Sequence, residues 1–136
     1  MKYIVVIALL LGASIHLQAQ AVGKAQVNAV AEDLIATYQL TEAQEAGAYT
    51  IAERRLRNQS EIAHLASSDQ KLYLQKKNAI REGEIVSLER LLNQEQLPIL
   101  REQMIERRKK ESELIKKMKA QGATREEIQL AVWEME

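Results

Sequence analysis

Glycine and proline, the residues that most often interrupt regular structure, are almost absent from this chain of 136 residues. Beyond residue 20 they occur only as Gly23, Gly47, Gly83, Gly122 and Pro98. The stretches between them are rich in Ala, Leu, Gln, Glu, Lys and Arg, which favour helices, and they lack runs of β-branched residues. Few interruptions mean few and long elements. The sequence therefore predicts an all-α protein.

Apolar residues recur at three-to-four spacing along the chain, as in amphipathic helices. The predicted helices cover residues 24–39, 41–66, 69–91 and 94–121, and a short last helix opens at Thr124. Short polar connections favour antiparallel neighbours, so the second and third helices are expected to form a long antiparallel helical hairpin with flanking helices. The chain has no Phe and one Trp, which favours thin, extended packing. The expected buried residues are Val27, Val30, Leu34 and Tyr38, then Tyr49, Ala52, Leu56, Ala63 and Ala66, then Leu72, Ala79, Ile80, Val86, Leu88 and Leu91, then Leu97, Leu100, Met104, Leu114, Ile115 and Met118.

Residues 1–19 show the order of charged, apolar and small regions that is typical of a secretory signal peptide. Lys2 precedes an apolar run over residues 3–11, and a small and polar stretch ends in Ala19-Gln20-Ala21. The run is shorter than the roughly 20 apolar residues of a membrane-spanning helix. We expect cleavage near Ala19, with Ala21 as the alternative, and a single exported domain over residues 20–136. A buried N-terminal helix or an uncleaved anchor is the other interpretation.

The charge and cysteine content narrow the expected partners. The chain has 19 Lys and Arg residues against 19 Asp and Glu residues, so no global basic field attracts nucleic acid, and we expect none as a partner. Because the chain has no cysteine, the exported domain is expected to carry neither a disulfide nor a lipid-anchoring thiol, and to be soluble.

The residues needed for catalysis or metal binding are sparse. His64 is the single histidine beyond residue 20, and the chain has no cysteine and no phosphate-binding glycine loop, so we expect no enzyme and no cofactor. Glu61 and His64 form a Glu-x-x-His pair, but a di-metal helical site needs a second histidine. The methionines Met104, Met118 and Met135 are interpreted as core residues rather than soft metal ligands. We expect no metal site.

Two segments share one helix-starting pattern. Leu40-Thr41-Glu42-Ala43-Gln44 is followed further on by Leu92-Asn93-Gln94-Glu95-Gln96, in which Asn replaces Thr. Thr and Asn both cap helices, and a Gln three residues on can reach back to the capping residue. With the signal peptide and the cysteine-free helical composition, the doubled motif resembles the Spy/CpxP family of small periplasmic helical stress proteins. Pro98 departs from the family pattern, and we expect it to delay or kink the start of the fourth helix.

This resemblance implies a curved, thin helical cradle, generally a homodimer, that works in the periplasm as an ATP-independent chaperone or stress adaptor for unfolded or partly folded envelope proteins. The motif residues Leu40, Thr41, Gln44, Leu92, Asn93 and Gln96 have an architectural role in this interpretation. One alternative is a sensor or regulatory subunit that binds a membrane sensor protein of an envelope-stress or metal-responsive system. Another is a structural helical, coiled-coil adaptor.

A cluster of basic residues on the second and fourth helices suggests where a client binds. Arg and Lys stems can cover apolar surface while their charges remain in water, which gives a face that attracts acidic and apolar segments together. An ordinary solvated face is the alternative, because glutamates are interleaved. The residues expected to contact a client are Arg54, Arg55, Leu56, Arg57, Ile62, Leu100, Arg101, Met104, Arg107 and Arg108.

Overall fold

The computed structural model describes residues 23–135, so the expected signal peptide over residues 1–19 lies outside the described part. Residues 23–135 fold into helices joined by turns, which confirms the predicted all-α class. The elements are α1 (Lys24–Tyr38), α2 (Glu42–Ile62), α3 (Leu65–Ser68), α4 (Gln70–Leu91), α5 (Leu97–Ala120) and α6 (Arg125–Glu134).

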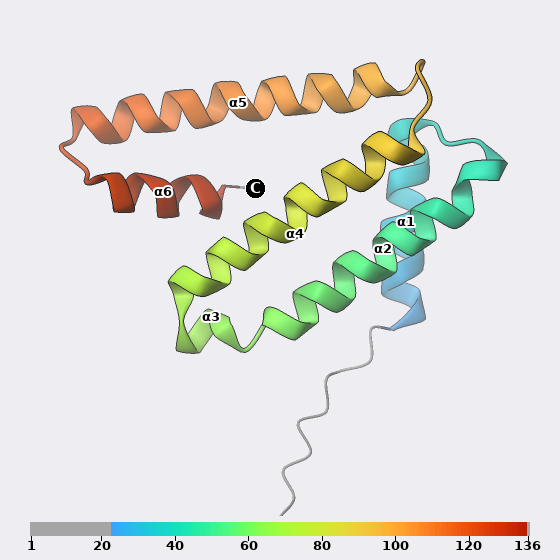
Figure 1. Cartoon of the computed structure of the whole chain (residues 1–136), viewed down its shortest axis with the longest axis horizontal. Coiled ribbons are helices and arrows are strands. Elements are labelled where there is room, and N and C mark those ends of the chain that lie inside the picture. The colour runs from blue at the N-terminus through green and yellow to red at the C-terminus, as the bar shows by residue number, and fades with distance from the viewer. Residues whose placement is uncertain (1–22, 136) are drawn as a thin grey trace, which may run out of the picture.

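The helices are arranged around α4 (Figure 1). α2 packs against both α1 and α4, and the short α3 lies at the turn between α2 and α4. α5 starts near the end of α4 and diverges from it, and α6 folds back into the widening space between them. α6 contacts both α4 and α5. Within residues 23–135, no helix combines the length and the apolar character needed to cross a membrane.

The second predicted helix, over residues 41–66, is two helices in the structure. α2 ends at Ile62 and α3 begins at Leu65. The hydroxyls of Ser67 and Ser68 donate to the carbonyl oxygen of His64 at 3.3 and 3.0 Å. Asp69 then caps α4, since its Oδ1 accepts from the backbone N–H of Leu72 at 3.0 Å. Asp69 thus ends α3 and begins α4.

The fourth predicted helix starts at Leu97 rather than at residue 94, and Pro98 explains the difference. A helix that began at residue 94 would need the N–H of residue 98 to bond the carbonyl of Gln94, and proline has no N–H. Residues 94–96 form a turn instead, and Pro98 falls in the first turn of α5, where a missing N–H is tolerated. The expectation that Pro98 delays the helix is confirmed.

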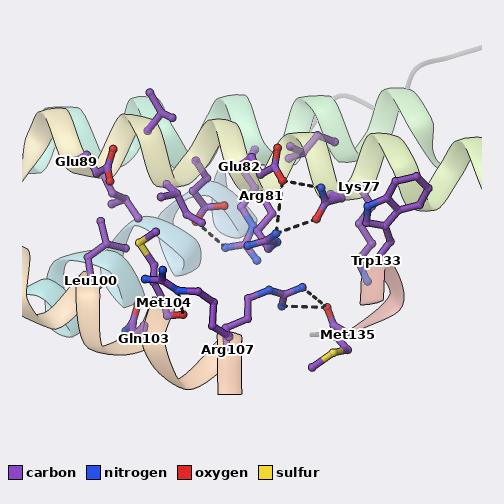
Figure 2. A pocket seen from close by; sticks show the side chains of 18 of the residues that line it. Lys77, Arg81, Glu82, Glu89, Leu100, Gln103, Met104, Arg107, Trp133 and Met135 are labelled. Carbon is purple, nitrogen blue, oxygen red and sulfur yellow. Dashed lines mark hydrogen bonds and ion pairs between the residues drawn. The ribbon is translucent and has the colours of Figure 1, made fainter. Parts of the chain in front are cut away.

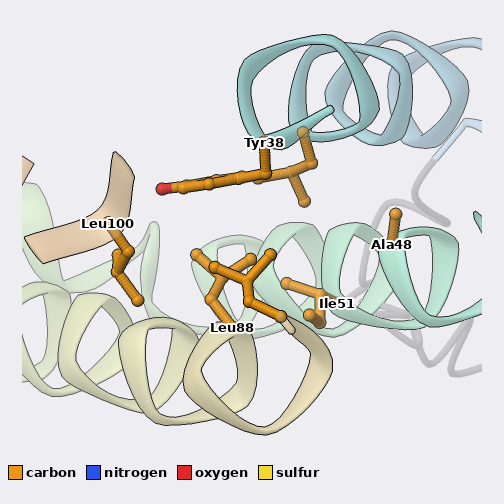
Figure 3. Packing of buried hydrophobic residues seen from close by; sticks show 7 residues of the cluster. Tyr38, Ala48, Ile51, Leu88 and Leu100 are labelled. Atoms are coloured by element: carbon orange, nitrogen blue, oxygen red, sulfur yellow. The ribbon is translucent and has the colours of Figure 1, made fainter. Parts of the chain in front are cut away.

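The core lies where α1, α2, α4 and the start of α5 meet. Figure 3 shows Tyr38 extending from α1 across this cluster, with Leu88 and Ile51 on one side and Leu100 near its hydroxyl end. Tyr38 is 4% exposed and Leu88 is 3% exposed. The cluster consists of Leu34, Tyr38, Ala48, Ile51, Leu88, Leu92 and Leu100, with Ile35, Leu40, Leu91, Leu97, Ile99 and Met104 packed against it.

The buried face of α2 is rotated from the predicted one. The structure buries Ala48, Ile51 and Ala52, whereas Tyr49 is 36% exposed. Small residues explain this choice, because they let neighbouring helices approach closely. At Gly47 an added Cβ would lie 2.5 Å from Cδ1 of Leu91, so this glycine permits the contact with α4. The predicted burial is also wrong for Ala63, Ala66, Ala79 and Val86, which are exposed.

Candidate functional site

Both copies of the capping motif form capping-box hydrogen bonds, the first at the start of α2 and the second at the turn that leads into α5. At the first, Oε1 of Gln44 accepts from the backbone N–H of Thr41 at 2.9 Å. At the second, Oε1 of Gln96 accepts from the backbone N–H of Asn93 at 3.0 Å, and Oδ1 of Asn93 accepts from the N–H of Gln96 at 3.0 Å. Each glutamine thus reaches back to its capping residue, as the capping box requires.

The structure also joins the two motifs to each other. Nε2 of Gln44 donates to Oε1 of Gln96 at 2.9 Å, and Nε2 of Gln96 donates to Oε1 of Gln44 at 2.9 Å. The same two amide groups donate to the carbonyl oxygens of Leu91, at 2.7 Å, and Gln39, at 2.9 Å. Gln96 is 5% exposed, so this pair is a nearly buried polar link among α1, α2, α4 and α5. Leu92 is buried beside it, and Leu40 packs against the same core.

A groove with a volume of about 860 Å³ opens between α4 and α5 and is closed at one end by α6 (Figure 2). We call it the α4–α5 groove. Its lining combines apolar side chains from α4, α5 and α6 with charged ones from α2, α4 and α5. The lining residues are Tyr38, Arg55, Gln59, Lys77, Asn78, Ile80, Arg81, Glu82, Glu84, Ile85, Val86, Leu88, Glu89, Leu100, Gln103, Met104, Arg107, Arg108, Glu111, Trp133 and Met135.

The apolar part of the groove is accessible from outside. Val86 on α4 is 44% exposed, and the half-buried Met104 faces the groove from α5. Trp133, the single tryptophan of the chain, lies beside α4 at the end closed by α6. Leu100 is only 3% exposed and belongs to the core below, so it contributes little surface for a client.

Most of the cations in the groove have acidic or polar partners. Nη1 of Arg55 lies 3.3 Å from Oε1 of Glu84. Nη2 of Arg81 donates to Oδ1 of Asn78 at 2.8 Å. Burial lowers the pKa of Arg81, and the neighbouring positive charge of Arg107 lowers it further. The groove is therefore a mixed apolar and ion-paired surface.

Arg107 holds the end of α6. Its Nη1 and Nη2 each donate to the carbonyl oxygen of Met135 at 3.2 Å, and Nη2 also reaches the carbonyl oxygen of Val132 at 3.5 Å (Figure 2). Nε of Arg107 is 2.9 Å from Oε1 of Glu111, an ion pair without the direction of a good hydrogen bond. A guanidinium at this position donates hydrogen bonds to the last carbonyl oxygens of a helix, which lack partners within it. Its positive charge also interacts favourably with the negative C-terminal end of the helix dipole. Arg107 was predicted to contact a client, and in this structure its guanidinium is engaged within the chain.

Tyr38 connects the core to the groove. Its hydroxyl donates to Oε1 of Gln103 at 2.6 Å, which ties α1 to α5. Burial raises the pKa of this phenol, and the charges of Glu84 and Asp33 raise it further. The neutral, donating form of Tyr38 is thus the form that the fold stabilises.

The structure gathers only part of the predicted client-binding set. Arg55, Leu100, Met104, Arg107 and Arg108 line the α4–α5 groove. Arg54 lies on a separate, smaller hollow, where its guanidinium donates to the hydroxyl of Ser87. The remaining predicted residues are outside the groove, exposed at Arg57 and Arg101 and half-buried at Leu56 and Ile62.

Sequence reasoning missed Val86, Arg81 and Trp133 as parts of one surface. Val86 was assigned to the core, and the spacing of residues on single helices does not indicate that α6 returns to α4. The single tryptophan was the one available signal, since a large aromatic residue on a short helix usually has a packing partner. Within residues 23–135, His, Asp and Glu side chains form no cluster of three that could hold a metal ion, and Glu61 and His64 are exposed. Comparison with known protein families, with curated proteins and with solved structures gives no match for this chain.

Proposed function

We propose that this chain is an ATP-independent chaperone or stress adaptor that binds unfolded or partly folded envelope proteins in the α4–α5 groove. The observation that supports it most is the composition of that groove. Accessible Val86 and Met104 lie beside paired arginines in a space of about 860 Å³. Unfolded segments present apolar and charged side chains together, so a surface of both kinds binds many sequences without requiring one.

The ion pairs in the groove suit weak and reversible binding. Arg55 and Glu84 form a pair whose side chains are 38% and 16% exposed, so it contributes only modestly to stability. Because Arg55 is the more exposed member of the pair, a client carboxylate can compete with Glu84 for its guanidinium. Apolar contact with Val86 and Met104 then supplies the binding free energy, at about 25 cal/mol for each Å² of apolar surface removed from water.

The proposal includes the setting that the sequence suggested. Export directed by residues 1–19 would place the protein in the periplasm, where binding must proceed without ATP. We further propose a homodimer in which antiparallel helical hairpins form a curved, thin cradle. Tyr49, which is 36% exposed, lies outside the groove and is a candidate for burial between two copies.

The test is suppression of client aggregation, with two matched variants. Val86 and Ile105 are β-branched residues on helices with similar exposure, 44% and 48%, but only Val86 lines the groove. We expect the purified protein at equal molar ratio to reduce light scattering by a denatured client. Val86→Glu should weaken this suppression strongly, and Ile105→Glu should leave it nearly unchanged.

Two results would overturn the proposal. The first is the absence of suppression by the unmodified protein, and tight binding to a membrane sensor fragment in that case would favour the sensor function. The second is equal loss of suppression in both variants, which would indicate binding by exposed apolar residues in general rather than by the groove.

A further inference from the structure

α6 packs against both α4 and α5 without burying any side chain. Among the described residues, α1, α2, α4 and α5 each bury at least one side chain, whereas α6 buries none. α6 has 10 residues, and isolated helices shorter than about 12 residues are marginal in water. It follows Gly122, whose φ of 78° lets the chain turn back after α5.

The contacts that hold α6 differ in strength. The ion pair of Lys71 with Glu126 is solvent-exposed, with both side chains more than 60% accessible, so it holds α6 only weakly. The capping box of Thr124 and Glu127 stabilises the helix itself and does not attach it to α4 or α5. Attachment therefore depends on the half-buried apolar face of α6 and on the bonds from Arg107 to its last carbonyls.

The features that seat α6 are general properties of an amphipathic helix. Ile128 and Val132 are half-buried and four residues apart, which places them on one face of α6, and the half-buried Met135 follows at the end of the helix. The contact with Arg107 uses main-chain carbonyl oxygens, which any helix presents at its C-terminus. Any helix with a similar apolar face and accessible C-terminal carbonyl groups can make the same contacts with α4, α5 and Arg107.

Such a helix matches the place that α6 occupies. A helix of 10 residues is about 15 Å long and about 10 Å wide. The α4–α5 groove, with about 860 Å³, adjoins this place. With α6 released, its site and the groove become one continuous trough between α4 and α5.

We propose that the walls of α4 and α5 covered by α6, together with the adjoining groove, form a docking surface for an amphipathic helix of a client protein, which displaces α6. This inference rests on the proposed function and specifies the kind of client segment bound. Helix-in-groove recognition through residues at three-to-four spacing is a common mode of peptide binding. In the free protein α6 covers the apolar walls of α4 and α5. The apparent affinity for a client helix is therefore lowered by the free energy needed to release α6.

The test uses a fluorescein-labelled peptide of residues 123–135 as the probe and a peptide of the same composition in permuted order as the control, with binding followed by anisotropy. Trp133→Ala in the full chain weakens the resident helix and leaves the α4 and α5 walls intact. We expect a roughly tenfold lower apparent Kd for the probe, because a larger fraction of the protein is open. Adding Arg107→Gln to that variant should raise the Kd about fivefold or more, since it removes the bonds to the helix end.

A locked protein provides the decisive control. Because the chain contains no cysteine, Lys71→Cys with Glu126→Cys can be joined by a cleavable bismaleimide that fixes α6 to α4. The probe should not bind the locked protein, and binding should return when the linker is cleaved. Equal binding to locked and released protein, or no binding to the Trp133→Ala variant with native far-UV circular dichroism, would overturn the inference.

The same samples separate this inference from the proposed function. If the denatured client is captured but the helical probe is not, the helix-docking surface is wrong and the chaperone function stands. If the probe binds as expected but aggregation is not suppressed, the docking surface stands and the chaperone function is wrong.

Discussion

The paired glutamines of the two capping motifs should contribute more to stability than local capping can explain. Gln96→Ala removes both hydrogen bonds to Gln44 and those to the backbone of Asn93 and Gln39. Each such bond contributes about 1 kcal/mol net, and partial solvation of the freed groups lowers the total, so we expect a loss of about 3 kcal/mol. For the half-exposed Gln44, replacement by Ala should cost about 2 kcal/mol, because water reaches the groups left behind.

The double variant tests whether the two residues act together. Both single variants remove the same reciprocal amide pair, so the separate losses count it twice. The double variant should therefore lose about 3.5 kcal/mol, roughly 1.5 kcal/mol less than the sum of the single losses. Equilibrium unfolding in urea, followed by far-UV circular dichroism, measures these differences.

A third capping box provides the matched control. Glu127 accepts from the N–H of Thr124 at 2.7 Å and is exposed, and its hydrogen bonds stay within α6. Glu127→Ala should reduce stability less than either glutamine substitution. A loss at Gln96 no greater than at Glu127, or strict additivity of the two glutamine substitutions, would refute the reasoning.

Three further predictions concern single positions. Gly83→Ala should stabilise the protein by about 0.5–1 kcal/mol in urea unfolding, because the added Cβ meets no described atom within 4 Å. Gly47→Ala should stabilise the protein less, or destabilise it, because the added Cβ would press against Leu91 on α4. Tyr38→Phe should lower the free energy of unfolding by about 1 kcal/mol. Because burial raises the pKa of Tyr38, the stability that its neutral hydroxyl contributes is present below the unfolded pKa and is lost as pH rises through the folded pKa. The Tyr38→Phe variant should therefore lose less stability in alkali than the unmodified protein. A backbone hydrogen bond from Thr124 lowers the pKa of Glu127. The stability that the Glu127 carboxylate gives α6 is therefore present above the unfolded pKa near 4.5 and is lost as pH falls through the folded pKa. Trp133 fluorescence should report this loss in acid, and the Glu127→Gln variant should not show it.

Local sequence signals predicted the helices and their ends well. The helical class, the cap at Asp69, the capping box at Thr124 and the delayed start caused by Pro98 all depend on residues within a few positions of one another. Such signals act before tertiary contacts form, so they can be read from the sequence. The break after Ile62 was missed because its residues continue an apparently helical pattern and the chain reversal itself depends on contacts with α4.

The candidate site depends on contacts between distant residues, and these were not predictable. Gln44 and Gln96 were assigned separate local roles, and their mutual hydrogen bonds require α2 and α5 to start side by side. On α2 the predicted buried stripe included Tyr49, whereas the structure buries Ala48 and Ile51. Close helix approach at Gly47 favours the face with small residues, and that approach is a property of the assembled fold.

The groove follows from the same long-range packing. Val86 reads as a core residue because its neighbours on α4 are apolar, yet α5 diverges from α4 at this level and leaves it exposed. Arg107 reads as a surface cation because its neighbours are charged, yet α6 returns to it and uses it as a C-terminal cap. In both cases the path of α5 and α6 determines the role of the side chain.

Site-specific photo-crosslinking tests the proposed groove most directly. A photoreactive amino acid is placed at Met104, inside the groove, or at its neighbour Ile105, which is 48% exposed and outside it. If the groove binds clients, a denatured client should crosslink strongly from position 104 and weakly from position 105. Stronger crosslinking from position 105, the more exposed of the two, would contradict the proposed function.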